Sequence, residues 1–194
     1  MKGTATVVKN AGSHFLLSEL PTWKPFPAVL KGKVRMSGNS STNPVAVGDV
    51  VTYECTVDPD ASHPASIVSI HDRKNHLIRR STNLSRQSHV IAANIDRAFL
   101  VVTLYFPEIK LPFLDRLLVT CEVYGIPATI VLNKVDIFKE EFPEEMENFR
   151  RIYENAGYEV ILTSARTGEG LDRLREAVTG SGGGQVCLFS GESG

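Results

Sequence analysis

The feature that most constrains this chain is an apolar run, Pro127 to Leu132, that ends abruptly in the polar tetrapeptide Asn133-Lys134-Val135-Asp136. Such a run is typical of a buried β-strand, and open α/β sheets place their ligand-binding loops at the carboxyl ends of strands. An Asp carboxylate only accepts hydrogen bonds and can take two donors at once. Asp136 can therefore pair with the N1–H and the amino group of guanine, whereas adenine lacks both donors.

The residues beside Asp136 suit the same ligand. Asn133 can donate toward the O6 side of the base or tie its loop to a neighbouring one. The aliphatic stem of Lys134 can lie flat against the purine face while its ammonium stays in solvent. A pattern of four residues is short, so a solvated turn after a core strand remains the competing interpretation of this segment taken alone.

Two further strand-like runs end in small-residue loops. The run Tyr158 to Leu162 leads to Ser164 and Ala165, where backbone N–H groups are expected to approach a base oxygen closely. The run Val186 to Ser190 leads to Gly191-Glu192-Ser193-Gly194, the first half of the phosphate-binding pattern G-x-x-x-x-G-K-[ST]. Right-handed crossovers between parallel strands bring such loops to one edge of a sheet, so we predict a single nucleotide site there.

Residues 92–194 alternate between strand-like and helix-like segments. An uninterrupted apolar strand over Arg97–Val102 precedes a helix that Gly125 closes, and an acidic helix is expected over Pro143–Asn155. Leu171 begins a further helical pattern that runs toward the C-terminus. This alternation predicts a doubly wound, mostly parallel α/β sheet.

Residues 1–72 have a different pattern, with short β-type runs separated by turn residues. About five such strands in about 70 residues predict a small closed β-barrel of the OB type. Trp23, Phe26 and Tyr53 offer aromatic rings that can stack on bases. Packing in the core or at the rim of the barrel is the commoner role of such rings, and it is the favoured interpretation.

A basic segment, residues 73–91, separates the barrel from the α/β domain, which gives predicted domains of 1–72 and 92–194. One interpretation of this segment is a solvated linker, and the other is a strip that contacts RNA phosphates. The residue types alone do not decide between them. The candidate RNA-binding residues in the segment are Arg73, Lys74, Arg79, Arg80 and Arg86.

Composition narrows the class of protein further. The formal net charge of −1 argues against a surface that binds nucleic acid everywhere, so any RNA affinity must come from a local patch. The three cysteines are widely spaced, which makes a disulfide framework or a zinc site within this chain unexpected. No apolar run approaches the roughly 20 residues of a membrane span, and no signal peptide is visible. We expect a soluble cytoplasmic protein that has no contact with membranes.

The order of the motifs resembles that of a known family. Asn133-Lys134-Val135-Asp136, then Ser164-Ala165, then the beginning of a phosphate loop is the reverse of the usual GTPase order, and it resembles the circularly permuted GTPases. Three upstream features narrow the resemblance to one family among these GTPases. They are the preceding barrel with Val47-Gly48-Asp49-Val50-Val51, the basic segment, and the run Ala92 to Arg97. Together they resemble the ribosome-small-subunit-dependent GTPase family, RsgA/YjeQ.

The resemblance implies specific roles for these residues. In it, Asn133, Lys134 and Asp136 read guanine, Ser164 and Ala165 support the base, and Gly191 to Gly194 begin the phosphate cradle. The phosphate-loop Lys, the Mg²⁺-binding hydroxyl residue, the switch segments and a zinc-binding domain would then lie beyond the sequence, as if the chain ended inside the phosphate loop. We therefore expect no catalytic residue and no Mg²⁺ or Zn²⁺ ligand within this chain, which alone would be inactive.

The resemblance also implies a function. It predicts a monomeric GTP-binding protein of small ribosomal subunit maturation that hydrolyses GTP to GDP and phosphate in its full-length form. Its partners would be GTP or GDP and the small ribosomal subunit with its rRNA. A competing hypothesis is a non-catalytic RNA-binding assembly adaptor, in which the same barrel precedes a degenerate GTPase-like domain.

Overall fold

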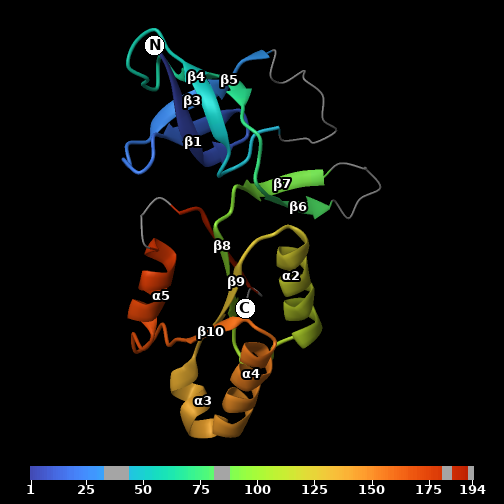
Figure 1. Cartoon of the computed structure of the whole chain (residues 1–194). Helices are drawn as coiled ribbons and strands as arrows, with labels where there is room; N and C mark the ends of the chain where they lie inside the picture. Colours follow the sequence, from blue (N-terminus) through green and yellow to red (C-terminus); the bar gives the residue numbers. More distant parts are fainter. Residues whose placement is uncertain (33–43, 81–87, 181–184, 192–194) are drawn as a thin grey trace. The chain divides into compact units, whose positions relative to one another are not determined.

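The chain folds into two compact units, Met1–Ile95 and Asp96–Gly194 (Figure 1). The computed structural model describes residues 1–32, 44–80, 88–180 and 185–191. Each unit has its own sheet and its own buried apolar residues, so the two are described separately.

The first unit contains a closed barrel with the strand order β1-β2-β3-β5-β4. Its strands are β1 (Lys2–Ala11), β2 (His14–Ser18), β3 (Phe26–Leu30), β4 (Val50–Glu54) and β5 (Ala65–Ile70). Neighbouring strands are antiparallel except for β3 and β5, which run parallel. Alternate residues such as Val7, Leu17 and Ile67 point inward and are fully buried, as a barrel interior requires. The predicted five-stranded OB-type barrel is confirmed.

The three aromatic residues singled out in the barrel have different surroundings. Phe26 and Tyr53 pack against the barrel core, with their ring centroids 4.9 Å apart, and the Tyr53 hydroxyl donates to Glu19. Trp23 is 66% exposed. Packing therefore accounts for Phe26 and Tyr53, whereas Trp23 lies at the surface.

Residues 73–91 were predicted to be a linker between the domains. In the structure, part of this segment forms a two-stranded antiparallel sheet within the first unit. Strands β6 (His76–Arg80) and β7 (Ser88–Ala93) pair with each other, and the two compact units divide after Ile95. Val90 is buried and Ala93 is fully buried, so this sheet has an apolar side. Its Lys and Arg residues give the segment the composition of a solvated linker, which is why the pattern alone concealed the strands.

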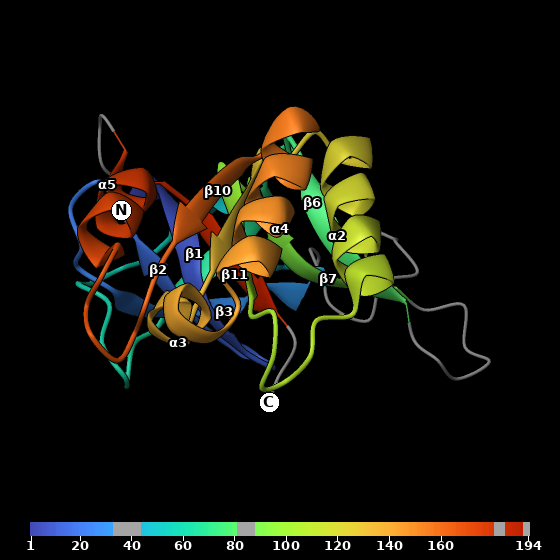
Figure 2. The same cartoon turned by 90° about the horizontal axis from the view of Figure 1, so that it is seen from below.

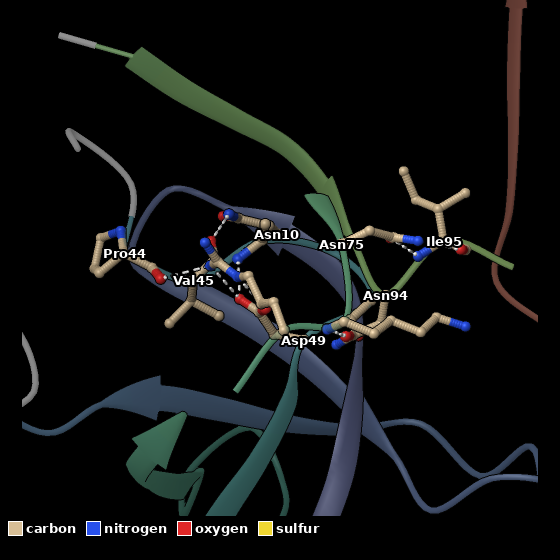
Figure 3. Close-up of polar contacts among 11 residues, drawn as sticks. Asn10, Pro44, Val45, Asp49, Asn75, Asn94 and Ile95 are labelled. Carbon is tan, nitrogen blue, oxygen red and sulfur yellow. Dashed lines mark hydrogen bonds and ion pairs between the residues drawn. The ribbon is translucent and has the colours of Figure 1, made fainter. Parts of the chain in front are cut away.

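A polar cluster joins β6 and β7 to the barrel (Figure 3). The Asp49 carboxylate is fully buried and accepts from Arg73 Nε and Nη2, each at 2.7 Å, and from the backbone N–H of Ala46 at 2.8 Å. Arg73 Nη2 also donates to the Pro44 carbonyl at 3.0 Å. Because two parallel N–H donors engage one carboxylate, the ion pair fixes direction as well as distance.

Two asparagines complete this junction (Figure 3). Asn94 Nδ2 donates to the Gly48 carbonyl at 2.9 Å. Asn75 Nδ2 donates to the Ile95 carbonyl at 2.9 Å, and the backbone N–H of Ile95 donates to Asn75 Oδ1 at 2.7 Å. The segment around Gly48 and Asp49 thus serves as the anchor that holds the β6–β7 sheet on the barrel.

The second unit is built on a four-stranded sheet of order β10-β9-β8-β11, in which every pair is parallel. Its strands are β8 (Arg97–Val102), β9 (Ala128–Leu132), β10 (Glu159–Leu162) and β11 (Cys187–Gly191). Its helices are α2 (Leu111–Val123), α3 (Val135–Glu141), α4 (Pro143–Asn155) and α5 (Leu171–Thr179). Figures 1 and 2 show α5 on one face of the sheet and α2 with α4 on the other. The predicted doubly wound sheet is confirmed.

The buried strands of this sheet read as continuous apolar runs because helices cover both faces. Phe99, Ile130 and Ile161 are fully buried, one from each of three adjacent strands. Gly125 closes α2 with φ +62°, the left-handed conformation that glycine adopts without a steric penalty. None of the described helices is long and apolar enough to cross a membrane.

Candidate nucleotide site

The parallel sheet places the predicted loops at one edge. Leu132 at the end of β9 pairs in register with Leu162 at the end of β10, and Gly191 at the end of β11 pairs with Val101 of β8. Because parallel strands end at the same side of a sheet, Asn133, the loop after β10 and the last residue of β11, Gly191, lie at the same edge. This edge is where the candidate nucleotide site lies.

Asn133 links two of these loops. Its Oδ1 accepts from the backbone N–H of Ala165 at 3.0 Å and from Thr163 Oγ1 at 3.4 Å. Its own backbone N–H donates to the Val102 carbonyl at 2.8 Å, which fixes its position over the sheet. Of the two roles that the sequence left open for Asn133, the structure contains the one that ties the loops together.

Lys134 marks the turn from β9 into α3. It has φ +69°, a left-handed conformation that is uncommon for a residue with a side chain and that often occurs at functional turns. Its Nζ donates to the Phe106 carbonyl. Lys134, Asn133 and Phe106 border a cavity of about 430 Å³, which extends to Thr103 and Val101 at the end of β8. Phe106 is itself 63% exposed beside this cavity.

Asp136 lies in the first turn of α3, with a side chain that is only 10% exposed. Its carboxylate accepts from the Ser164 hydroxyl, and its Oδ2 accepts from Arg166 Nε at 2.8 Å. These contacts, the Ser164 hydrogen bond foremost and then Arg166, hold the pKa of Asp136 below its ordinary value. The carboxylate is therefore ionised at neutral pH and accepts hydrogen bonds only.

The loop after β10 is held in a tight conformation around Ser164, which is fully buried. The backbone N–H of Ser164 donates to the Glu169 carbonyl, and that of Gly168 donates to the Ser164 carbonyl, both at 2.9 Å. Gly170 closes the loop with φ +73°, and a Cβ atom there would lie 1.9 Å from the Leu162 carbonyl oxygen. Only glycine fits this position, so Gly170 is a steric requirement of the loop.

The strand that leads to the phosphate-loop sequence is anchored at both ends. At its end, Gly191 lies so close to β8 that a Cβ atom would be 2.4 Å from the Val101 carbonyl oxygen. At its start, Asp96 Oδ2 accepts from the backbone N–H of Val186 at 2.8 Å, and the Asp96 N–H donates to the Val186 carbonyl. The predicted phosphate-loop residues Glu192, Ser193 and Gly194 lie outside the described residues.

The candidate RNA-binding residues that the structure describes have different partners. Arg73 is engaged by Asp49. Lys74 donates its backbone N–H to Asn94 Oδ1 at 2.9 Å. In the β6–β7 sheet, Arg79 pairs in register with His89 and Arg80 with Ser88, whereas Arg86 lies outside the described residues.

Sequence reasoning did not single out Arg166 or Asp96 as site residues. Both belong to or adjoin motifs that it did use, since Arg166 follows Ser164-Ala165 directly and Asp96 lies within the run Ala92 to Arg97. Their partners are distant in sequence, so nothing local indicated what they contact. In the part of the chain that the structure describes, no three His, Cys, Asp or Glu side chains gather as a metal site.

The second unit is a parallel α/β domain with Asn133, Asp136 and Gly191 near one edge of its sheet, and the OB-type barrel precedes it in the sequence. A family model described as RsgA GTPase matches residues 70–194. The chain belongs to the RsgA GTPase family, which confirms the resemblance inferred from the motif order.

Relatives of known name support this assignment. The small ribosomal subunit biogenesis GTPase RsgA of Flavobacterium johnsoniae is 42% identical over 192 residues, which are 98% of this chain and 57% of that protein. The protein of the same name from Bacteroides fragilis is 42% identical over 194 residues, covering 100% of this chain and 59% of that protein. The chain thus spans 57–59% of the length of these curated relatives.

Solved structures agree with the fold. The crystal structure of YjeQ from Thermotoga maritima superposes with a TM-score of 0.78 at 27% identity and covers 100% of this chain and 62% of that one. The crystal structure of YloQ, described as a circularly permuted GTPase, has a TM-score of 0.72 at 24% identity and covers 100% of this chain and 61% of that one. The second likeness concerns the fold alone.

Proposed function

We propose that the full-length protein binds GTP and hydrolyses it to GDP and phosphate during maturation of the small ribosomal subunit. One observation carries the nucleotide part of this proposal, namely the recessed, ionised carboxylate of Asp136 at the sheet edge where Asn133 joins the loop of Ala165. The relatives from Flavobacterium johnsoniae and Bacteroides fragilis, whose names describe a GTPase of small ribosomal subunit biogenesis, support the biological part. The same proposal places the protein in the cytoplasm as a monomer.

In this proposal the guanine base pairs with Asp136 through its N1–H and amino group, and the Lys134 stem covers one purine face. Asn133 acts by holding the two base-binding loops together, and Ser164 acts by orienting the Asp136 carboxylate. Gly191 begins the phosphate cradle, continued by Glu192, Ser193 and Gly194.

The phosphate groups are expected to bind together with Mg²⁺, as they do in GTPases generally. The pattern that begins at Gly191 supplies a Lys and a hydroxyl residue to the phosphates and the metal, and both positions follow Gly194 in that pattern. Our proposal for the 194 residues is therefore limited to recognition of the base and to the start of the phosphate cradle.

A protein of these 194 residues is expected to release no phosphate from GTP above the buffer background. The Lys and hydroxyl positions of the phosphate-loop pattern are not among these 194 residues, so those two groups cannot stabilise the charge that develops in the transition state. The full-length protein should turn GTP over and should be stimulated by purified small ribosomal subunits. Phosphate release from both proteins, measured side by side, checks this expectation.

The outcomes of that assay separate the hypotheses. Robust turnover by the 194-residue protein would show that the catalytic groups are assigned to the wrong part of the sequence. A full-length protein that binds small subunits but neither binds nor hydrolyses GTP would favour the non-catalytic adaptor instead.

We also propose that the β6–β7 segment contacts rRNA phosphates. The motivation is the basic composition of residues 73–91 next to an OB-type barrel, a fold that commonly binds nucleic acid. Arg73 already serves the ion pair with Asp49, so this proposal rests on Lys74, Arg79, Arg80 and Arg86.

Replacing Arg79 and Arg80 together by Ala is expected to weaken binding to small subunits and to flatten its salt dependence. Two lost phosphate contacts change the slope of log affinity against log salt by roughly 1.4–1.8. A matched control replaces Arg151 and Arg175 of the second unit, which removes the same charge from α4 and α5. If the parental slope persists in the β6–β7 variant, the segment is a surface element without RNA contacts.

A further inference from the structure

Arg166 covers the carboxylate that is proposed to read guanine. Both Nε, at 2.8 Å, and Nη2 of Arg166 lie on the same oxygen, Oδ2, of Asp136. The Arg166 side chain is 75% exposed, whereas the Asp136 side chain is 10% exposed. Arg166 therefore approaches Asp136 from solvent, the side from which a ligand must also approach, because the protein itself surrounds the rest of the carboxylate.

The chemistry of the two donors is closely matched. The edge of guanine that carries N1–H, C2 and the amino group has the connectivity of a guanidine, and it presents two N–H donors side by side. The guanidinium of Arg166 presents the same fork of donors. Guanine would place one N–H on each carboxylate oxygen, and Oδ2 already accepts two N–H groups from Arg166, so Arg166 and the base compete for Oδ2.

The surroundings of Asp136 make this competition local and reversible. Ser164 is fully buried beside Asp136, and its hydrogen bond contributes to the lowered pKa of that carboxyl, so Asp136 keeps a polar neighbour when Arg166 leaves. The Arg166 side chain is 75% exposed, so little buried surface is lost when it turns away from Asp136.

We propose that Arg166 is an internal competitor for the guanine subsite, which caps Asp136 in the absence of nucleotide and must be displaced for the base to bind. The proposal rests on the proposed nucleotide-binding function and adds a residue that tunes affinity. Capping keeps a recessed carboxylate paired while the site is empty, since an unpaired one would be costly. It also lowers the apparent affinity by the fraction of molecules in which Asp136 is uncapped.

The competitor role predicts that removing Arg166 changes nucleotide affinity in an unusual direction. Removing a positive charge near an anionic ligand ordinarily weakens binding, whereas removing an internal competitor strengthens it. Because the Arg166 side of the ion pair with Asp136 is largely exposed, the pair is weak. We therefore expect Arg166→Ala to tighten guanine-nucleotide binding by about two- to sixfold. The gain should appear in the association rate and leave the dissociation rate unchanged, because Arg166 no longer touches Asp136 once the base is bound.

The experiment uses the full-length protein and a fluorescent GDP analogue labelled on the ribose, with association and dissociation followed by stopped flow. Arg166→Lys keeps the charge but lacks the fork, so it should fall between the parent and Arg166→Ala. The control is Arg175→Ala, whose side chain is 71% exposed and pairs with Asp172 on α5, so it loses the same charge from the same unit. The advantage of Arg166→Ala should shrink as salt rises, because salt screens the parental ion pair.

Affinity that is unchanged or weaker in Arg166→Ala, or a change confined to the dissociation rate, would overturn the competitor role. A weaker Arg166→Ala variant with faster dissociation would instead mean that Arg166 holds the bound nucleotide. If the parent itself fails to bind GDP, the failure belongs to the proposed function rather than to Arg166.

Discussion

Asp136→Asn in the full-length protein is expected to reverse its nucleotide preference from GTP toward xanthosine triphosphate. An Asn amide presents a donor where guanine also donates, whereas xanthine offers a carbonyl oxygen at that position. Because Asp136 is recessed and fixed by Ser164, the mismatch cannot be relieved by turning the side chain into solvent. The loss of GTP affinity should be on the order of 10–100-fold, as expected when a charged hydrogen-bonding partner is removed.

Competition binding with the two nucleotides, performed on the variant and the parent, measures this reversal. Asp172→Asn is the matched control, because it makes the same chemical change on a 93%-exposed side chain of α5. The control should keep the parental preference for GTP. If Asp136→Asn also keeps it, the base is read elsewhere and the assignment of this sheet edge is wrong.

The second large expected effect is on the stability of the first unit, at the ion pair between Asp49 and Arg73. Asp49→Ala is expected to destabilise that unit by about 3–5 kcal/mol, because it leaves the guanidinium of Arg73 partly buried without its counter-charge. The same change removes the acceptor of the Ala46 N–H. Urea unfolding followed by the fluorescence of Trp23, the one tryptophan in the sequence, reports on this unit directly.

Two comparisons isolate the cause. Asp49→Leu combined with Arg73→Met should recover much of the lost stability, since replacing both members of a buried ion pair leaves no uncompensated charge. Lys31→Ala breaks the exposed pair with Glu54, whose side chains are 57% and 44% exposed, and should shift stability by at most about 1 kcal/mol. An Asp49→Ala variant no less stable than Lys31→Ala would mean that the junction contributes little.

Most of the fold follows from local patterns. Apolar runs such as Arg97–Val102 and Ala128–Leu132 are continuous because helices cover both faces of the sheet, and that pattern is visible in the sequence. The convergence of Asn133 and Ala165 was predictable as well, since parallel strands with right-handed crossovers end at one edge. The short strands of the barrel were also predictable, because a strand buried on one side has an apolar residue at every second position.

The pairing of charged groups was decided by the tertiary structure alone. In the sequence, Arg73 belongs to a basic segment that has the composition of a linker. Only the fold brings Asp49, 24 positions earlier, into contact with it. Arg166 is an ordinary loop arginine until the loop returns to Asp136, 30 positions earlier. The sequence by itself determined the two architectures and the residues at the sheet edge, because hydrophobic periodicity is a local property. Which arginine pairs with Asp49 and which one pairs with Asp136 depends on contacts between distant residues, and only the tertiary structure creates those.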